Sequence, residues 1–156
     1  MKTINESIMK FAFFDGMRPE HLAVFPEGAK AVQFKAGDVL FRERDPASQF
    51  YLIESGKIAL EAHEPANGTT SVQSLGAGDV LGWSWLFPPF FWHFQARAIE
   101  PTNAIALDGA HLLVSAERDH DFGYELMKRV AQVVIRRLQA TRKQLLGLQI
   151  ESAMEG

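Results

Sequence analysis

The residue types that ligate metals or act as nucleophiles occur in this chain without the spacing that such chemistry needs. The 156 residues contain no cysteine, which excludes disulfides, thiol catalysis and thiolate metal ligands. The five histidines never stand at the His-x-His or His-Glu-x-x-His spacing of a metal site. We therefore expect neither a metal ion nor a cofactor.

The segment Gly82-Trp83-Ser84-Trp85-Leu86 comes within one residue of the G-x-S-x-G turn that presents a nucleophilic serine. The final glycine of that motif is missing, and the surrounding pattern is not the alternation of strands and helices that the motif requires. Paired carboxylates are also missing from this part of the sequence. We therefore expect no catalytic residue, and a protein that is not an enzyme.

Aromatic side chains are concentrated in residues 83–94. These 12 residues hold 7 of the 17 aromatic residues of the chain, where an even distribution would place about one. The seven rings are Trp83, Trp85, Phe87, Phe90, Phe91, Trp92 and Phe94. Three interpretations are open: the rings fill a pocket as part of the core, they bind an apolar or aromatic ligand, or they form a surface that docks a protein or touches a membrane.

The composition is that of a compact globular domain. A length of 156 residues falls within the range of one domain, and 47% apolar with 22% charged residues is close to the globular average. The first ten residues lack the apolar core of a signal peptide, and the longest apolar stretch, 80–94, is interrupted by Pro88 and Pro89. We expect one domain over residues 1–156 in a cytoplasmic protein without a membrane span.

The first two thirds of the chain predict short helices followed by strands. Pro19 suits the first turn of a short helix, and we expect helices within residues 1–30. Polar and apolar residues alternate at 57–62 and 71–75, which predicts strands in a β-roll over residues 31–107. Turn residues recur about every ten residues, a spacing typical of a sandwich or barrel. These turns are expected at 35–38, 44–46, 54–56, 66–68 and 76–79.

The pentapeptide AGDVL occurs twice, at 36–40 and at 77–81. In both places a Gly-Asp turn leads into a Val-Leu strand. We expect the two copies to form equivalent corners in a roll of antiparallel strands.

Residues 108–150 have helical periodicity. Asp108 is placed to cap a short helix, and Asp119 or Asp121 to cap a long one from Phe122 to about Gln149. Seven residues of the long helix follow the four-three spacing of a coiled-coil seam: Met127, Ala131, Val134, Leu138, Thr141, Leu145 and Leu148. A second apolar stripe lies beside it, formed by Leu126, Val130 and Val133. We expect one stripe to face the β-roll and the other a partner helix, which predicts a homodimer.

Basic residues are concentrated in this same helix. The net charge of the chain is −3, yet residues 122–150 hold six basic residues and one acidic residue. Such an end can indicate nucleic-acid binding, but Arg136, Arg137, Arg142 and Lys143 all fall outside the seam. We expect these four residues to form a solvated flank of the helix.

Four motifs stand in one order along the chain. They are FFDGM at 13–17, FKAGDVLFRERDPASQFYLIESGKIAL at 34–60, LGAGDVLGWSWL at 75–86 and ARAIEPTNAIAL at 96–107. Together they resemble the cyclic-nucleotide-binding domain superfamily, the sensory domain of catabolite-activator-type bacterial regulators, over about residues 11–148. The resemblance implies a mainly β fold, an antiparallel β-jelly roll (double-stranded β-helix) with short N-terminal helices and a long C-terminal helix that dimerises and carries the signal.

The resemblance also implies a phosphate-binding cassette, which here corresponds to residues 82–98 (the cassette segment). The family pattern has a glutamate after the position of Gly82, for the ribose 2′-hydroxyl, and later an arginine followed by two small residues. In this chain Trp83 stands at the glutamate position. Trp92, His93 and Phe94 stand at the positions of the arginine and its two small neighbours. A cyclic phosphodiester buried without a charged partner is costly, so we expect cAMP and cGMP to bind weakly.

The sequence thus predicts a stand-alone, ligand-sensing regulatory module with a diverged cassette. The candidate ligand-binding residues are Gly82, Trp83, Ser84, Trp85, Leu86, Trp92, His93, Phe94 and Arg97. One alternative is a protein-interaction module that docks through the aromatic segment or the C-terminal helix. A second is a cyclic-nucleotide binder whose rebuilt cassette uses Ser84, backbone amides and Arg97, although strand alternation places Arg97 opposite the aromatic side chains.

Nucleic-acid recognition is expected to be absent. The chain stops at Gly156, six residues past Ile150. This leaves no room for a recognition helix after the long helix, so we expect no sequence-specific binding of nucleic acid.

Overall fold

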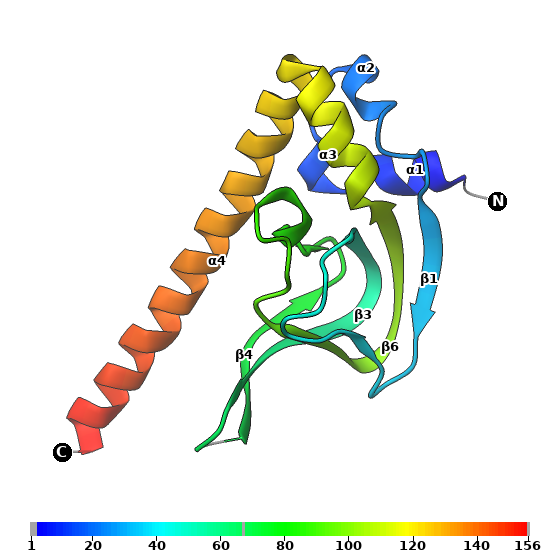
Figure 1. Cartoon of the computed structure of the whole chain (residues 1–156). Coiled ribbons are helices and arrows are strands. Elements are labelled where there is room, and N and C mark those ends of the chain that lie inside the picture. The colour runs from blue at the N-terminus through cyan, green and yellow to red at the C-terminus, as the bar shows by residue number, and fades with distance from the viewer. Residues whose placement is uncertain (1–2, 67, 156) are drawn as a thin grey trace.

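The protein is a β-roll with helices at one end and one long helix along its side (Figure 1). The computed structural model describes the backbone of residues 3–66 and 68–155 and the side chains of residues 3–63, 65–66 and 68–147. The helices are α1 (Ile4–Met9), η1 (Ala12–Phe14), α2 (Pro19–Leu22), η2 (Ser84–Leu86), α3 (Gly109–Arg118) and α4 (His120–Glu155). The strands are β1 (Lys30–Phe34), β2 (Val39–Phe41), β3 (Gln49–Glu64), β4 (Gly68–Gly76), β5 (Val80–Leu81) and β6 (Gln95–Asp108).

Two long strands, β3 and β6, organise the sheet. The strand order is β1-β6-β3-β4, with β2 paired to β6 and β5 paired to β3. All pairs are antiparallel, and β3 faces β6 from Gln49↔Asp108 to Glu61↔Gln95. The register puts Ile58, Leu60, Ala96 and Ala98 on the face that is buried in the core.

The prediction of a turn at residues 54–56 is wrong, because strand β3 runs through this segment without a break. The register of β3 against β6 shifts here instead. Gly56 has a φ of +98°, and a Cβ on it would lie 2.5 Å from the carbonyl oxygen of Pro101 and 2.6 Å from the Cα of Thr102. The glycine therefore allows a close approach of two strands rather than a reversal of the chain.

The two AGDVL copies form equivalent corners, as expected. In each corner the aspartate carboxylate accepts a hydrogen bond from the backbone N–H three residues earlier, at 2.7 Å for Asp38 and 2.8 Å for Asp79. Each corner also exchanges two backbone hydrogen bonds with another strand, at Ala98 for the first copy and at Ile53 for the second. Both copies of the repeat therefore join neighbouring parts of the roll through the same pattern of hydrogen bonds.

The expected caps fix the helices at the end of the roll. Asp108 accepts a hydrogen bond from the N–H of His111 and caps α3. Of the two candidates for the long helix, Asp119 is the cap, because its Oδ1 accepts from the N–H groups of Asp121 and Phe122 at 3.0 and 3.2 Å. Helix α4 continues to Glu155, beyond the expected end near residue 149.

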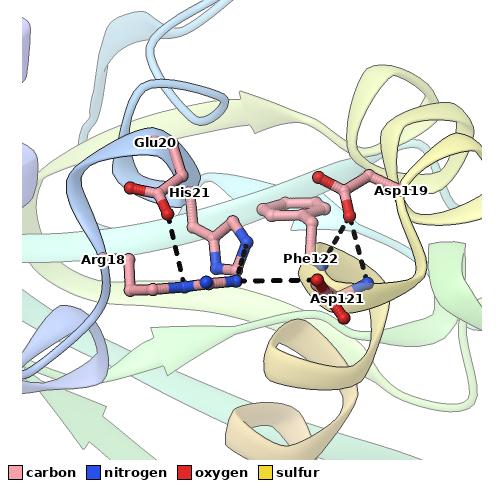
Figure 2. Close-up of polar contacts among 6 residues, drawn as sticks. All are labelled: Arg18, Glu20, His21, Asp119, Asp121 and Phe122. Carbon is pink, nitrogen blue, oxygen red and sulfur yellow. Dashed lines mark hydrogen bonds and ion pairs between the residues drawn. The ribbon is translucent and has the colours of Figure 1, made fainter.

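Helix α2 holds the beginning of α4 through the contacts drawn in Figure 2. The guanidinium of Arg18 donates to Nε2 of the buried His21 at 3.0 Å and lies 4.0 Å from the carboxylate of Asp121. The His21 ring meets the Phe122 ring edge-on, with centroids 5.7 Å apart. Farther along α4, Nη1 of Arg129 donates to the carbonyl oxygen of Phe13 at 2.5 Å. These contacts anchor the first third of α4 to the body.

The two stripes of α4 lie in different environments. Leu126, Val130 and Val133 are buried against the body. In the seam, Met127, Leu138 and Leu145 are 44%, 67% and 57% exposed. Ala131 is also exposed, Val134 and Thr141 are half-buried, and the side chain of Leu148 lies outside the described residues. The stripe that faces the roll is thus Leu126-Val130-Val133, and most of the described seam faces away from it.

Candidate functional site

The cassette segment begins with a tight turn closed by its own tryptophan. Gly82 follows β5, and η2 begins two residues later, over Ser84–Leu86. The indole N–H of Trp85 donates to the carbonyl oxygen of Gly82 at 2.5 Å, and the ring is buried with 2% exposure. Trp85 therefore belongs to the core and satisfies its one polar group locally.

Trp92 fills the space beside Gly82. Its ring is 5% exposed and stacks on Phe41, with centroids 3.8 Å apart and planes 13° apart. Gly82 has a φ of +90°, and a Cβ on it would lie 2.7 Å from Cη2 of Trp92. This distance is too short for any real Cβ, so the indole occupies the volume above the Gly82 backbone. Trp85 and Trp92 are therefore both buried, as the first of the three interpretations of the aromatic residues requires.

Trp83 is half-buried and forms the rim of the segment next to α4. The guanidinium carbon of Arg137 lies 4.7 Å from the centroid of the Trp83 ring, in a cation–π contact. Nη2 of the same guanidinium donates to the carbonyl oxygen of Val80. Burial lowers the pKa of Arg137 to about 10, against the opposing effect of the Asp79 carboxylate. The expectation that Arg137 belongs to a solvated flank is therefore wrong, whereas Arg136, Arg142 and Lys143 are exposed.

Gln73 of β4 ties the same part of α4 to the sheet. Its amide nitrogen donates to the carbonyl oxygen of Arg137 at 3.0 Å and contacts the hydroxyl of Thr141 at 3.4 Å. The sequence predicts Thr141 only as a seam position, and here it also contacts the roll. The middle of α4 is thus joined to β4, β5 and the start of the cassette segment.

Arg97 lies on the outer face of the sheet. It alternates with Ala96 and Ala98, which are fully buried in the core, and it pairs across the strands with Ala59. Its guanidinium makes an ion pair with the carboxylate of Glu61, which is 5% exposed and also accepts from the amide of Gln95 at 3.0 Å. The geometry thus places Arg97 away from Trp92, and its charge is neutralised by Glu61.

The remaining candidate residues divide between core and surface. Ser84 and Leu86 are buried, Phe94 is half-buried, and His93 is exposed. Between them the loop 87–91 is exposed throughout, with Phe87, Phe90 and Phe91 at 41%, 37% and 45%. The aromatic residues of 83–94 therefore lie in two environments. Trp85 and Trp92 fill space inside the protein, whereas Phe87, Phe90 and Phe91 face solvent.

In the part of the chain that the structure describes, no group of three or more metal-ligating side chains comes together. None of the described helices is both long enough and apolar enough to cross a membrane.

The sequence pattern does not mark two charged residues of this region as site residues. Glu61 lies in an alternating strand segment that predicts only a solvated face, yet it is buried under Arg97. Asp79 is predicted only as a turn residue, yet it lies close enough to Arg137 to affect its pKa. The partners are 36 and 58 positions apart, so local patterns carry no signal for either pair.

Comparisons with known proteins agree on one family. The family model described as cyclic nucleotide-binding domain matches residues 31–119. A "CRP-like cAMP-activated global transcriptional regulator" of Mycobacterium tuberculosis is 26% identical over 145 residues, which cover 93% of this chain and 63% of that protein. This chain therefore spans less than two thirds of the length of that relative. "Acetyltransferase Pat" of Mycolicibacterium smegmatis is 36% identical over 70 residues, 45% of this chain and 21% of that protein.

The structural comparison agrees with the sequence comparisons. A crystal structure from Geobacter metallireducens, of a protein described as cyclic nucleotide-binding, superposes with a TM-score of 0.79 at 27% identity. The match covers 88% of this chain and 99% of that one. The expected antiparallel β-jelly roll with short N-terminal helices and a long C-terminal helix is confirmed.

Proposed function

The chain belongs to the cyclic nucleotide-binding domain family, and from that premise we propose that it is a non-enzymatic, ligand-sensing regulatory module that binds cAMP and cGMP only weakly. The observation that carries the proposal is the position of Trp92, whose ring lies against Gly82 and stacks on Phe41. A ligand that used this part of the roll would have to displace a buried indole.

The charges of the cassette segment also support weak binding. A cyclic phosphodiester is an anion, and its burial requires charged or well-placed hydrogen-bond donors. Trp83 and Trp92 stand where the family pattern has a glutamate and an arginine. Arg97 is engaged with Glu61 on the other face of the sheet.

The backbone amides around η2 are also partly engaged. The N–H of Leu86 donates to the carbonyl oxygen of Trp83 at 3.0 Å, and the N–H of Phe87 donates to that of Ser84 at 3.4 Å. A cassette rebuilt on these amides would first have to break local hydrogen bonds. A charge-assisted hydrogen bond contributes about 1.5–3 kcal/mol, so the loss of two such partners weakens binding by several powers of ten.

Calorimetric titration of the full chain with cAMP and cGMP tests the proposal. We expect no saturable binding below about 1 mM nucleotide. Micromolar affinity for either nucleotide would overturn the proposal and favour the alternative of a rebuilt cassette. In that event, the variant Arg97→Gln decides whether Arg97 supplies the missing charge, because it would lose the binding.

We further propose that the module is a homodimer joined through the seam of α4. Met127, Leu138 and Leu145 expose large apolar side chains on one side of the helix, and a contiguous apolar surface of this kind is uncommon on a monomer. A dimer would place two copies of α4 side by side as the output of the sensor. The mass of the particle in solution tests this assignment.

A second candidate function is docking of a protein partner through the loop 87–91. Its three phenylalanines are exposed, and Phe90 holds a φ of +63°, which is strained for an aromatic residue. Two backbone hydrogen bonds fix this conformation, from Phe90 to Phe87 at 2.9 Å and from Ala47 to Phe90 at 2.7 Å. If the loop is a binding surface, Phe91→Ser changes the free energy of unfolding by less than about 0.5 kcal/mol. A loss of more than about 2 kcal/mol would assign Phe91 to the core and argue against docking.

A further inference from the structure

The side of α4 that carries Arg136 borders a groove that lies apart from the cassette segment. We propose that this groove binds a small organic anion with an apolar or aromatic body, held by Arg136 and Arg137. The role of this anion as a signal rests on the proposed sensing function. The groove itself is observed in the structure and does not depend on that function.

The groove has a volume of about 440 Å³ and lies between η1, the β4–β5 turn and α4. Its lining comprises Ala12, Phe13, Gln73, Ser74, Leu75, Gly78, Asp79, Val80, Val133, Arg136, Arg137, Ala140 and Gln144. A volume of this size is within the range of sites for small molecules. None of these lining residues comes from residues 82–98, so the groove is separate from the place that Trp92 fills.

The two arginines have donors to spare. Of the five N–H bonds of the Arg137 guanidinium, only the one to the carbonyl oxygen of Val80 has a hydrogen-bond partner among the described residues. Within the same part of the chain, Arg136 makes no hydrogen bond or ion pair. Both arginines line the groove, and each guanidinium keeps unpaired donors in the planar geometry that suits phosphate and carboxylate groups.

Within the lining of the groove, acidic residues do not balance these two charges. Asp79 is the one acidic residue of the lining, and its Oδ2 already accepts a hydrogen bond from the N–H of Gly76 at 2.8 Å. Two guanidiniums against one carboxylate leave a net positive charge at the groove. The net charge of the whole chain is −3. An anion is therefore attracted by the local positive charge of the groove and not by the overall charge of the protein.

The floor of the groove favours an apolar or aromatic body on the anion. Phe13, Leu75, Val80 and Val133 line it, and all four are buried core residues. The amides of Gln73 and Gln144 add polar groups to the lining. A purely inorganic ion would leave the apolar floor in contact with water, whereas an aromatic ester would cover it.

An occupant of this groove would touch α4 and the β4–β5 turn together. Arg137 already contacts Val80 and Trp83, and Gln73 bonds to the backbone of α4. A bound anion would add a further link between the sheet and the helix. The state of α4 would therefore respond to the ligand without any change inside the roll.

Three probes test the chemistry by calorimetry on the full chain: 1-naphthyl phosphate, 1-naphthol and inorganic phosphate. We expect 1-naphthyl phosphate to bind at least about tenfold more tightly than either of the others, a difference of about 1.4 kcal/mol. Equal affinity for 1-naphthol would show that only the apolar floor binds. Equal affinity for inorganic phosphate would show that only the charge matters. Either result overturns the proposal.

Variants locate the binding. Arg136→Gln is the principal variant, because the side chain is exposed and makes no hydrogen bond or ion pair among the described residues. We expect it to weaken the binding of 1-naphthyl phosphate at least about tenfold. Arg142→Gln is the matched control, since it removes the same charge from the same helix outside the groove, and its affinity should equal that of the unmodified chain. Equal affinity of the Arg136→Gln variant and the unmodified chain would overturn the proposal.

Backbone amide NMR spectra of the labelled chain complete the test. The added probe should shift signals from residues 73–80 and 133–144. Shifts confined to residues 82–98 would instead place the ligand at the cassette segment and contradict the groove. The cyclic-nucleotide titration decides the proposed function separately, because weak binding of cAMP is compatible with either outcome at the groove.

Discussion

The contact between Trp92 and Gly82 can be measured as a coupling between two substitutions. Trp92→Ala removes a buried ring that stacks on Phe41, and such truncations cost about 3–5 kcal/mol. Gly82→Ala has two costs in the unmodified chain. The φ of +90° disfavours any Cβ by about 1–2 kcal/mol. The overlap with the Trp92 ring adds about 1–3 kcal/mol, as overpacking does.

The double variant separates these two costs. With Trp92 truncated, the overlap with the ring disappears. The backbone cost of Gly82→Ala remains, together with the close approach of its Cβ to the carbonyl oxygen of Gln49 at 3.3 Å. We therefore expect a coupling free energy of about 1–3 kcal/mol between the two substitutions. Gly78→Ala is the matched control, because Gly78 has a φ of +91° and a Cβ on it would meet no atom within 4 Å. Its cost should be about 1–2 kcal/mol, whether or not Trp92 is present.

Urea unfolding followed by far-ultraviolet circular dichroism measures all these variants at one protein concentration. If Trp92→Ala does not fold, Trp92→Phe replaces it, with a smaller loss and a smaller coupling of the same sign. Additive costs for Gly82 and Trp92 would refute the packing of the indole against Gly82. An unchanged melting temperature for Trp92→Ala would refute the burial of Trp92 in the core. Docking of a protein partner would then become the favoured function.

Two further predictions concern pH and assembly. Burial raises the pKa of Tyr51 above its usual 10.0. The folded chain therefore keeps the phenol proton to a higher pH than the unfolded chain does. The stability that this group contributes is complete below pH 10 and is lost as the pH rises through the raised pKa. Urea unfolding at increasing pH should therefore show the unmodified chain losing stability relative to Tyr51→Phe above about pH 10, and parallel curves would contradict this. For the dimer, light scattering at micromolar concentration should give twice the chain mass of 17.4 kDa, and Leu138→Glu with Leu145→Glu should give the monomer. Gln139→Glu is the control that should remain dimeric, and a monomer for the unmodified chain would refute the seam.

Features that depend on neighbours in sequence could be predicted from the sequence. The AGDVL corners and the caps at Asp108 and Asp119 each contain a hydrogen bond from a backbone N–H to an aspartate two or three residues away. The two stripes of α4 arise from apolar side chains that recur every three or four residues. The types and spacing of neighbouring residues are enough to predict such features. The spacing of the turns predicted a sandwich or barrel, and the jelly roll was implied by the family resemblance that four motifs in one order carry.

Features that depend on distant contacts could not be predicted in this way. The segment 54–56 has turn residues, but the approach of Pro101 and Thr102 to Gly56 makes it part of a strand. Arg137 has the spacing of a solvated residue, but Trp83, 54 positions earlier, covers its guanidinium. In both cases tertiary packing decided the environment of residues whose local pattern indicated another one.

Helix α4 continues well beyond Thr141, the last of its described residues that hydrogen-bonds to the roll. The backbone continues for 14 residues from Thr141, where Gln73 holds it, to Glu155. At a rise of about 1.5 Å per residue this extension is about 21 Å long. A tilt of about 10° at Thr141 would move the far end by about 4 Å, while the residues at the pivot move by a small fraction of that distance. A rearrangement too small to disturb the packed roll is therefore magnified into a displacement that a neighbouring molecule can detect.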